Sequence, residues 1–418
     1  MTQSAVTEPP LALGGGVTTD SAVANRCGID SVELARIERF LNETPAEDLQ
    51  RLFSPQELAD AGAGPGRVAS LAARFAAKEA CLKLFPAETA HHRIQAEDFS
   101  VVRDEHGAPQ AVLSPNAADV AARHRIRAIR LSLTHDKISA SAVALAIPER
   151  ATPSLAGRLF YEGLRIRRGV VLANLRRVFN EGVDDEEIKR LAQAHYGHLL
   201  ANIGEFIRMR FVSEARRAQM VRVENVEVFA AALARRKGVI VLTGHFGSWE
   251  VSTVAGLSQY PEVRGQIYFV RRPIKWRWVD AWVTRRFQRA GFGVLPKRGG
   301  LDAILEVLER GHTVVFPFDQ HAAGRDAIRV DFFGHPAGTM RSLAVLALAS
   351  GASVLPAASW REPDGRHVLR FESPLPLVDL EDTNEAIRLN TRAYNQALER
   401  LVLRHPEQWY WVHRRWKD

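Results

Sequence analysis

The chain has 418 residues, of which 46% are hydrophobic and 25% are charged, and its net charge is +8 at pH 7. A chain of this length usually divides into two domains, and the balanced composition excludes a mostly disordered protein. The positive charge favours an acidic partner, either anionic lipid or an acidic protein. Nucleic acid is disfavoured, because there is no zinc-finger spacing and no RNP-like aromatic motif.

The N-terminal segment and the cysteines indicate a cytosolic protein. Residues 1–24 lack the basic start and apolar core of a secretory signal peptide, so we expect a flexible leader. Cys27 and Cys81 match no ligand spacing and are expected to be reduced thiols. The nearest approach to a membrane span, LAVLALASGASVLPAA, is interrupted by Gly, Ser and Pro. It predicts a helix, a turn and a buried strand, because a spanning helix needs roughly 18 apolar residues.

Residues 25–148 mix strands and helices in an α+β pattern. A short strand in NRCGIDSVEL is followed by the helical segments LARIERFLNE and RVASLAARFAAKEACLKLF. The segment DFSVVRDEHGAPQAVLS predicts a hairpin, and IRLSLTHD and ISASAVALAI predict two further strands joined by a tight turn. Pro148, Pro153 and Gly157 then interrupt the periodicity, so residues 149–157 are predicted to be a linker.

Residues 158–418 begin with helices and continue as an alternation of strands and helices. LRIRRGVVLANLRRVF and DEEIKRLAQAHYGHLLANIGEFIRMRF have helical periodicity. The strand-like segments that follow are GVIVLTG, GQIYFVRR, HTVVFPFD, ASVLPAASW and HVLRFESPL. Alternation of this kind predicts an α/β domain with a largely parallel sheet flanked by helices.

Charged residues of the first half allow two interpretations. Within the helix around residues 67–85, Glu79 and Lys83 form an ordinary i,i+4 surface pair, with Lys78 snorkelling out of an apolar stripe. The wider pattern favours a catalytic role. In chain order it contains GIDSVE, RIER, FSPQE, the helix RFAAKEACLK and LSLTH. Together these motifs, within about residues 25–148, resemble the holo-acyl-carrier-protein synthase family of 4′-phosphopantetheinyl transferases.

This resemblance implies transfer of phosphopantetheine from coenzyme A to a serine of apo-acyl carrier protein. A Mg²⁺ ion neutralises the diphosphate in such a reaction. By the resemblance, Asp30 and Glu79 hold the Mg²⁺, and Lys83, with Lys78, faces the phosphate oxygens. One or two protein carboxylates suffice, since Mg²⁺ keeps several of its waters.

The same resemblance assigns three more residues and an assembly. Arg36 and Arg39 would contact the acidic carrier protein, and His135, at a strand end, would lie near the coenzyme A site. The alternative for His135 is a hydrogen-bonded core histidine. A homotrimer with sites between subunits is also implied. The glycine-containing GTG loop usual after the catalytic helix is absent, since the chain reads FPAETAHHRI there.

In the second half, TGHFGSWE places His245 after a strand and Glu250 in the helix that follows. A carboxylate bonded to one imidazole nitrogen lets the other nitrogen accept a proton from a hydroxyl. The motif, together with GVVLANLRRVF, FPFDQ, FFGHPA and HPEQWYWVHR, resembles the lipid A lauroyl/myristoyl acyltransferase family.

That family transfers an acyl chain from acyl carrier protein to a glycolipid hydroxyl. By the resemblance, His245 is the general base, Glu250 is its partner, and Asp319 is a supporting carboxylate. Arg286 joins them, with Arg289 as a rival. The acceptor is left open, because Ser248 replaces the usual asparagine and YFVRRPIKWRW replaces a YRPxxNP-like segment.

The family's N-terminal membrane helix is replaced by RLFYEGLRIRRGVVLANLRR, which is expected to be a basic amphipathic helix. It lies either on an anionic membrane, at the cytoplasmic face of the inner membrane, or against the catalytic domain with its arginines solvated. We therefore expect a bifunctional enzyme that serves one carrier protein. The alternatives are one active domain beside a docking module, a non-catalytic scaffold, or an acyltransferase that uses coenzyme A thioesters.

Overall fold

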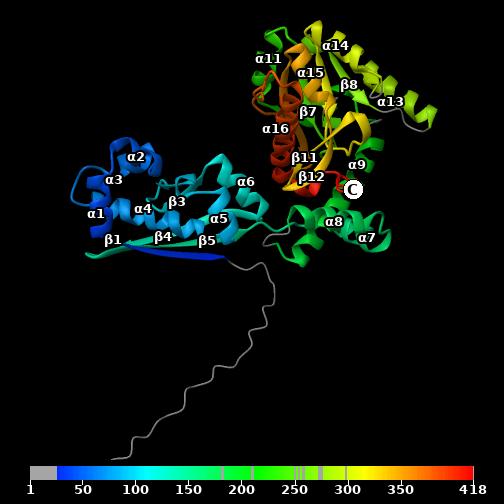
Figure 1. The fold of residues 1–418 in the computed structure, drawn as a ribbon. Helices are drawn as coiled ribbons and strands as arrows, with labels where there is room; N and C mark the ends of the chain where they lie inside the picture. The colour runs from blue at the N-terminus through cyan, green and yellow to red at the C-terminus, as the bar shows by residue number, and fades with distance from the viewer. Residues whose placement is uncertain are drawn as a thin grey trace, which may run out of the picture.

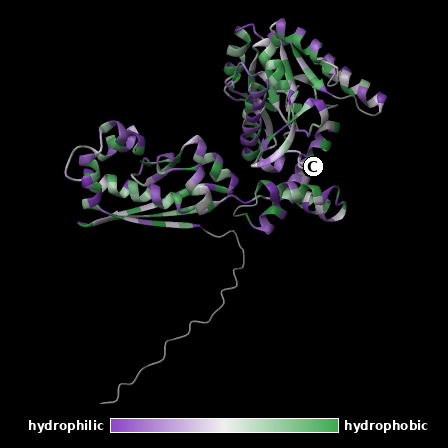
Figure 2. Cartoon of the chain, in the orientation of Figure 1, coloured by the Kyte–Doolittle hydropathy of each residue, from purple (hydrophilic) through white to green (hydrophobic). Residues whose placement is uncertain are grey.

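The computed structural model describes residues 26–179, 183–208, 211–248, 251–252, 255–256, 259–271, 276–296 and 299–417 (Figure 1). The predicted leader lies outside these residues. Buried apolar side chains form one core between Val32 and Ala146 and two more between Tyr161 and Val412. Apolar residues concentrate along the strands and on the inner faces of the helices (Figure 2).

The N-terminal domain (residues 26–148) is a five-stranded sheet in the order β1-β5-β4-β3-β2, antiparallel at every pairing. Its elements are β1 (Cys27–Glu33), α1 (Leu34–Glu43), α2 (Ala46–Leu52), α3 (Pro55–Ala61), α4 (Arg67–Leu82), α5 (Ala87–Arg93), β2 (Phe99–Arg103), β3 (Pro109–Leu113), α6 (Pro115–Arg123), β4 (Ile126–His135) and β5 (Ser139–Pro148). Both predicted hairpins are therefore confirmed, as β2–β3 and β4–β5.

Helix α4 packs across β1 and β5 because its buried face is built of small residues. Five alanines of α4 are buried, so its backbone approaches the sheet closely. A Cβ atom on Gly28 of β1 would lie 1.9 Å from the carbonyl oxygen of Ala80. Only glycine fits this crossing, which brings the start of β1 against the C-terminal end of α4.

The C-terminal domain (residues 155–417) holds a seven-stranded sheet in the order β6-β14-β13-β7-β10-β8-β9. All its neighbouring pairs are parallel except β13 with β14, so the largely parallel sheet that the alternation predicts is confirmed with one antiparallel pair. The elements are α7 (Leu155–Gly163), α8 (Arg168–Val178), α9 (Asp185–Arg208), α10 (Glu214–Gln219), β6 (Val221–Glu224), α11 (Val226–Ala234), β7 (Val239–Thr243), β8 (Ile267–Arg271), α13 (Arg277–Arg289), β9 (Gly293–Pro296), α14 (Leu301–Glu309), β10 (Thr313–Pro317), β11 (Ala327–Phe332), β12 (His335–Met340), α15 (Ser342–Ser350), β13 (Ser353–Arg361), β14 (His367–Phe371) and α16 (Thr383–Arg404).

The basic segment at residues 158–177 is not the single helix that its charge pattern predicts. It divides into α7 and α8, because Arg165 and Arg167 adopt left-handed backbone angles, with φ of 49° and 52°. In the parts of the chain that the structure describes, no helix combines the length and the apolar character that crossing a bilayer requires.

The two domains contact each other through buried ion pairs. Arg125, just after α6, donates to Glu187 of α9 and to Glu149, both at 3.0 Å. Arg123 at the end of α6 pairs with Glu399 of α16. Glu187 and Glu399 are both buried. Within the predicted linker, the Ala151 amide N–H also donates to Glu187 at 2.7 Å, so this part of the linker is held against the second domain.

Candidate active sites

The first candidate site lies where β1 crosses α4. The Lys83 ammonium, at the C-terminal end of α4, donates to the Asp30 carboxylate at 2.8 Å and to the Ile29 carbonyl oxygen at 2.8 Å. Lys83 is half exposed, so it can reach a bound ligand without leaving this corner. The close packing at Gly28 is what brings these groups together from two elements.

Glu79 shares the electrostatic environment of this corner. Its pKa is raised by partial burial and then by the negative charge of Asp30, while Lys83 and Arg36 act in the opposite direction. A carboxyl group whose pKa is raised by burial and by a neighbouring carboxylate is ionised at a cost that a divalent cation relieves. Their oxygen donors also suit Mg²⁺. Within the described residues no group of three or more His, Cys, Asp or Glu could hold a metal, so Asp30 and Glu79 would need water or substrate oxygens to complete its coordination.

The structure separates Lys78 from this site. Its ammonium is buried, lies 3.0 Å from the Glu57 carboxylate, and donates to the Phe99 carbonyl oxygen. Burial lowers the pKa of Lys78, and the charge of Glu57 opposes that shift. The expectations that Lys78 snorkels to solvent or faces phosphate are wrong in this structure, because Glu57, on α3, supplies a buried partner. Glu57 also accepts the amide N–H of Val101.

The other residues assigned to the first site are exposed. Arg36 and Arg39 lie one turn apart on α1, and the charge of Arg36 reaches Glu79. His135 is exposed at the end of β4, so the core-histidine alternative is wrong. The segment that stands in place of the family's glycine loop contains helix α5.

The second candidate site is formed by the carboxyl ends of two adjacent parallel strands. β7 pairs with β10 so that Thr243 is opposite Pro317, and His245 and Asp319 each follow two residues later. The His245 ring Nδ1 lies 2.8 Å from one Asp319 carboxylate oxygen, and the His245 backbone N–H donates to the other at 2.7 Å. Asp319 therefore contacts His245 directly and orients its imidazole ring. With Nδ1 as the donor, Nε2 is left to accept a proton.

Asp319 is buried and remains ionised. Burial would raise the pKa of this carboxyl, but the charge of His245 and the hydrogen bonds from His245 and Trp409 lower it to about 2. The close packing here favours glycine at position 244, since a Cβ atom there would lie 2.9 Å from a Phe246 ring carbon and 3.0 Å from an Asp319 oxygen. A permanent negative charge on one side of the imidazole stabilises the imidazolium that forms after proton transfer.

The C-terminal segment closes over this site, which sequence reasoning missed. The Trp409 indole N–H donates to Asp319 at 3.0 Å, and the Tyr410 amide N–H donates to the His245 carbonyl oxygen at 3.1 Å. His413 Nε2 accepts the amide N–H of His321 at 2.9 Å. The only sequence signal was the motif HPEQWYWVHR, which suggested the family but not a contact with the strand ends.

The remaining predicted residues of the second site are only partly described. Glu250 lies outside the described residues, as does part of the YFVRRPIKWRW segment. Arg286 is within α13, but its side chain is not among those described, whereas Arg289 is exposed on that helix. Ser248 is buried at 6% exposure.

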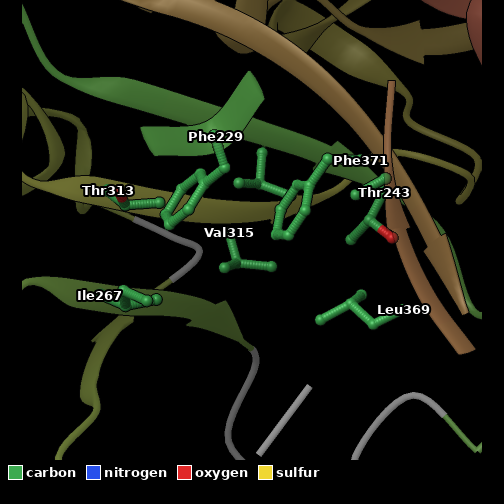
Figure 3. A pocket seen from close by; sticks show the side chains of 9 residues that line it. Phe229, Thr243, Ile267, Thr313, Val315, Leu369 and Phe371 are labelled. Carbon is green, nitrogen blue, oxygen red and sulfur yellow. The ribbon is translucent and has the colours of Figure 1, made fainter. Parts of the chain in front are cut away.

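A narrow apolar cavity opens on one face of the C-terminal sheet (Figure 3). Thr243, two residues before His245, forms part of its wall. The rest of the lining is Phe229, Val241, Ile267, Thr313, Val315, Ala357, Leu369 and Phe371. The face of the sheet that includes β7, the strand leading to His245, is therefore lined mostly by apolar side chains at this cavity.

Comparisons with known proteins match the two parts of the chain to two different families. Residues 142–418 match the model of the bacterial lipid A biosynthesis acyltransferase family, and residues 26–143 match that of the 4′-phosphopantetheinyl transferase superfamily. A holo-[acyl-carrier-protein] synthase of Clavibacter michiganensis is 40% identical over 30% of this chain and 96% of its own length. The lipid A biosynthesis lauroyltransferase of Escherichia coli is 24% identical over 62% of this chain and 82% of its own length. A Helicobacter pylori holo-[acyl-carrier-protein] synthase, crystallised in complex with coenzyme A, is 28% identical over 29% of this chain and 99% of that chain, with a TM-score of 0.25.

The amino-terminal match covers nearly the whole length of single-domain relatives, and the carboxy-terminal match covers more than half of this chain. The chain therefore belongs to the bacterial lipid A biosynthesis acyltransferase family and carries in front of that domain a complete holo-[acyl-carrier-protein] synthase-like domain.

Proposed function

We propose that the chain is a bifunctional enzyme. The N-terminal domain would transfer 4′-phosphopantetheine from coenzyme A to a serine of apo-acyl carrier protein, with Mg²⁺. The C-terminal domain would transfer an acyl group from acyl carrier protein to a hydroxyl of a lipid or glycolipid. The observation that carries this proposal is that each domain has its own polar site: Asp30 with Lys83 and Glu79 in the first, and His245 on Asp319 in the second.

In the first site, Asp30 and Glu79 would hold Mg²⁺, which when bound supplies charge neutralisation at the coenzyme A diphosphate. Lys83 is placed to donate to a phosphate oxygen, because it is half exposed and anchored beside Asp30. The serine oxygen would bond to the phosphorus that carries pantetheine as the pyrophosphate bond breaks, adenosine 3′,5′-diphosphate would leave, and the serine proton would pass to solvent water. Exposed Arg36 and Arg39 on α1 would contact the acidic carrier protein.

In the second site, the acceptor hydroxyl would give its proton to Nε2 of His245 as its oxygen attacks the thioester carbonyl. The imidazolium is stabilised by Asp319, and it returns the proton to the leaving thiolate. Positioned proton transfer of this kind contributes roughly 10²–10⁴-fold to the rate. The apolar lining next to Thr243 suits an acyl chain, although its walls would have to move apart to admit one.

Two assays and two variants test the proposal. The full-length protein is incubated with apo-carrier protein, coenzyme A and Mg²⁺, and the phosphopantetheine mass shift of the carrier is recorded. It is then given acyl-carrier protein with a panel of lipid acceptors, and released thiol is measured. Glu79→Gln is expected to abolish the mass shift and leave acyl transfer, and His245→Ala is expected to do the reverse.

Each alternative predicts a different outcome. A mass shift without acyl transfer to any acceptor, or the opposite, would leave one domain as a docking module. If Glu79→Gln keeps the mass shift and His245→Ala keeps acyl transfer, the site assignments are refuted. Transfer from acyl-coenzyme A but not from acyl-carrier protein would contradict the proposed donor.

Self-association of the N-terminal domain is also proposed, as a homotrimer. Ile29 and Val143 are paired across β1 and β5, and Leu145 follows on the same face, with exposures of 61%, 39% and 37%. The opposite face of β5 packs on α4 through buried alanines. An apolar patch on one side of a sheet favours an interface. The test is the molar mass of the full chain and of its Val143→Lys variant by light scattering. A full chain that is a monomer at all concentrations would contradict the proposed trimer.

Both proposed reactions share a carrier protein, and the proposed acceptor is a lipid. We therefore place the enzyme in the cytoplasm, on the cytoplasmic face of the inner membrane. The contact between the domains supports the use of one carrier protein by both sites, because a carrier protein released from one site remains near the other. Fractionation of cells that express the full chain tests this location.

A further inference from the structure

Three tryptophans at the start of α13 are unusually exposed. Trp276 and Trp278 expose 64% and 76% of their surface, and Trp282 exposes 37%. Tryptophan is mostly buried in folded proteins, and an exposed apolar group of this size marks an interaction surface. The helix lies at the outer edge of the C-terminal domain (Figure 1).

The exposed residues of α13 lie on one side of the helix. Trp278, Trp282, Arg285 and Arg289 follow one another at spacings of four, three and four residues, which form a single stripe. The inner side is anchored by Phe287, whose ring centroid lies 4.8 Å from that of Phe269 on β8. The helix is thus held on the domain by one side and presents the stripe outward.

The charge of this surface is positive. Arg277, Arg285 and Arg289 are exposed. The single acidic residue of α13, Asp280, forms an ion pair with Arg271 of β8, so it does not neutralise the stripe. We define the Trp–Arg stripe as Trp278, Trp282, Arg285 and Arg289, together with the exposed Trp276 and Arg277 beside its N-terminal end.

We propose that the Trp–Arg stripe binds the surface of an anionic phospholipid bilayer. Indole rings partition to the boundary between headgroups and acyl chains, where the ring is in an apolar region and its N–H meets polar groups. Guanidinium groups pair with lipid phosphates. Tryptophan and arginine also occur at protein–protein interfaces, so binding of the acidic carrier protein by the stripe is the competing outcome of the test.

The position of the stripe relative to the second site strengthens the proposal. β8 is parallel to β10, which is parallel to β7, so all three strands end at the same edge of the sheet. His245 and Asp319 lie at that edge, and Trp276 follows the end of β8 within a few residues. A membrane bound by the stripe would be on the side from which a lipid hydroxyl reaches His245. The inference rests on the proposed acyl transfer to a lipid acceptor, but vesicle binding can be measured without any acyl transfer.

The test is sedimentation of the full-length protein with vesicles of phosphatidylcholine alone or mixed with phosphatidylglycerol. We expect binding to the anionic vesicles and a blue shift of tryptophan emission. Trp276→Ala with Trp278→Ala is expected to weaken partitioning by roughly tenfold or more. Arg285→Gln with Arg289→Gln is expected to weaken it by roughly thirtyfold at low salt.

A matched control removes exposed apolar side chains from another helix. Leu155 and Leu159 of α7 expose 74% and 67%, and Leu155→Ala with Leu159→Ala should leave vesicle binding unchanged. Loss of binding in this control, with retention in the tryptophan variant, would overturn the proposal and assign the membrane to α7. Unchanged vesicle binding in both the tryptophan variant and the leucine control would overturn the proposal as well. So would an arginine variant that loses binding to carrier protein but still binds vesicles. If binding fails while acyl transfer to detergent-dispersed lipid persists, this inference fails and the proposed function stands.

Discussion

Trp409→Phe tests whether the C-terminal segment positions the acyl-transfer site. Trp409 donates the third hydrogen bond to a buried Asp319 carboxylate that also holds His245. The variant keeps an aromatic ring among Phe332 and Trp411 but removes the donor. We expect the substitution to act on the geometry of His245 rather than on substrate binding.

The magnitude follows from the charge of the acceptor. A hydrogen bond to a charged group contributes about 1.5–3 kcal/mol, and a group left short of a partner loses about that amount. If the loss falls on the transition state, kcat decreases by about 10- to 100-fold. The pKa of Asp319, now about 2, would rise, yet the carboxyl would remain ionised at pH 7. The expected loss therefore comes from a misplaced imidazole and not from a neutral partner.

The assay measures thiol release from acyl-carrier protein with a lipid acceptor, as kcat and KM separately. Trp411→Phe is the matched control, because the buried Trp411 indole donates to the Pro406 carbonyl oxygen and not to Asp319. We expect kcat to fall in Trp409→Phe with KM for the carrier unchanged, and to fall much less in Trp411→Phe. Equal losses in both variants, or full kcat in Trp409→Phe, would refute the positioning role.

The remaining predictions concern stability. Gly28→Ala forces a Cβ atom to within 1.9 Å of the Ala80 carbonyl oxygen; we expect a loss of about 1–3 kcal/mol in unfolding free energy by chemical denaturation, and an unchanged midpoint would contradict the close packing. Glu187→Gln removes one carboxylate from buried Arg125; we expect a loss of about 3 kcal/mol and faster proteolysis between the domains, and a melting temperature equal to that of the unmodified chain would argue against this contact. Burial lowers the pKa of His195 from 6.5 to about 4. The unfolded state therefore binds this proton first on acidification, and His195 should contribute a loss of stability of up to about 1.4 kcal/mol per pH unit between pH 6.5 and pH 4. Burial also lowers the pKa of His198, His405 and His413 to about 4, so these residues contribute to the same slope; His195→Gln should reduce the slope without abolishing it, and an identical slope would exclude His195 as a source.

The sequence alone predicted most of the local elements and the positions of several charged residues along them. The apolar periodicity of α4, the turn between β2 and β3, and the alternation of strands with helices are signals that short segments carry by themselves. The positions of His245 and Asp319 after two strands also follow from sequence, because parallel strands end at one edge of a sheet.

Only the tertiary structure decided which groups become partners. Lys78 meets Glu57, 21 residues away, and so has neither the solvent-exposed nor the phosphate-facing role expected of it. Trp409 reaches Asp319 across 90 residues, and Arg125 reaches Glu187 across 62. Such pairs depend on how distant segments pack, and they leave no periodic pattern in the chain. A buried charge is stabilised by whichever opposite charge the fold brings near it, so its partner is known only when the fold is known.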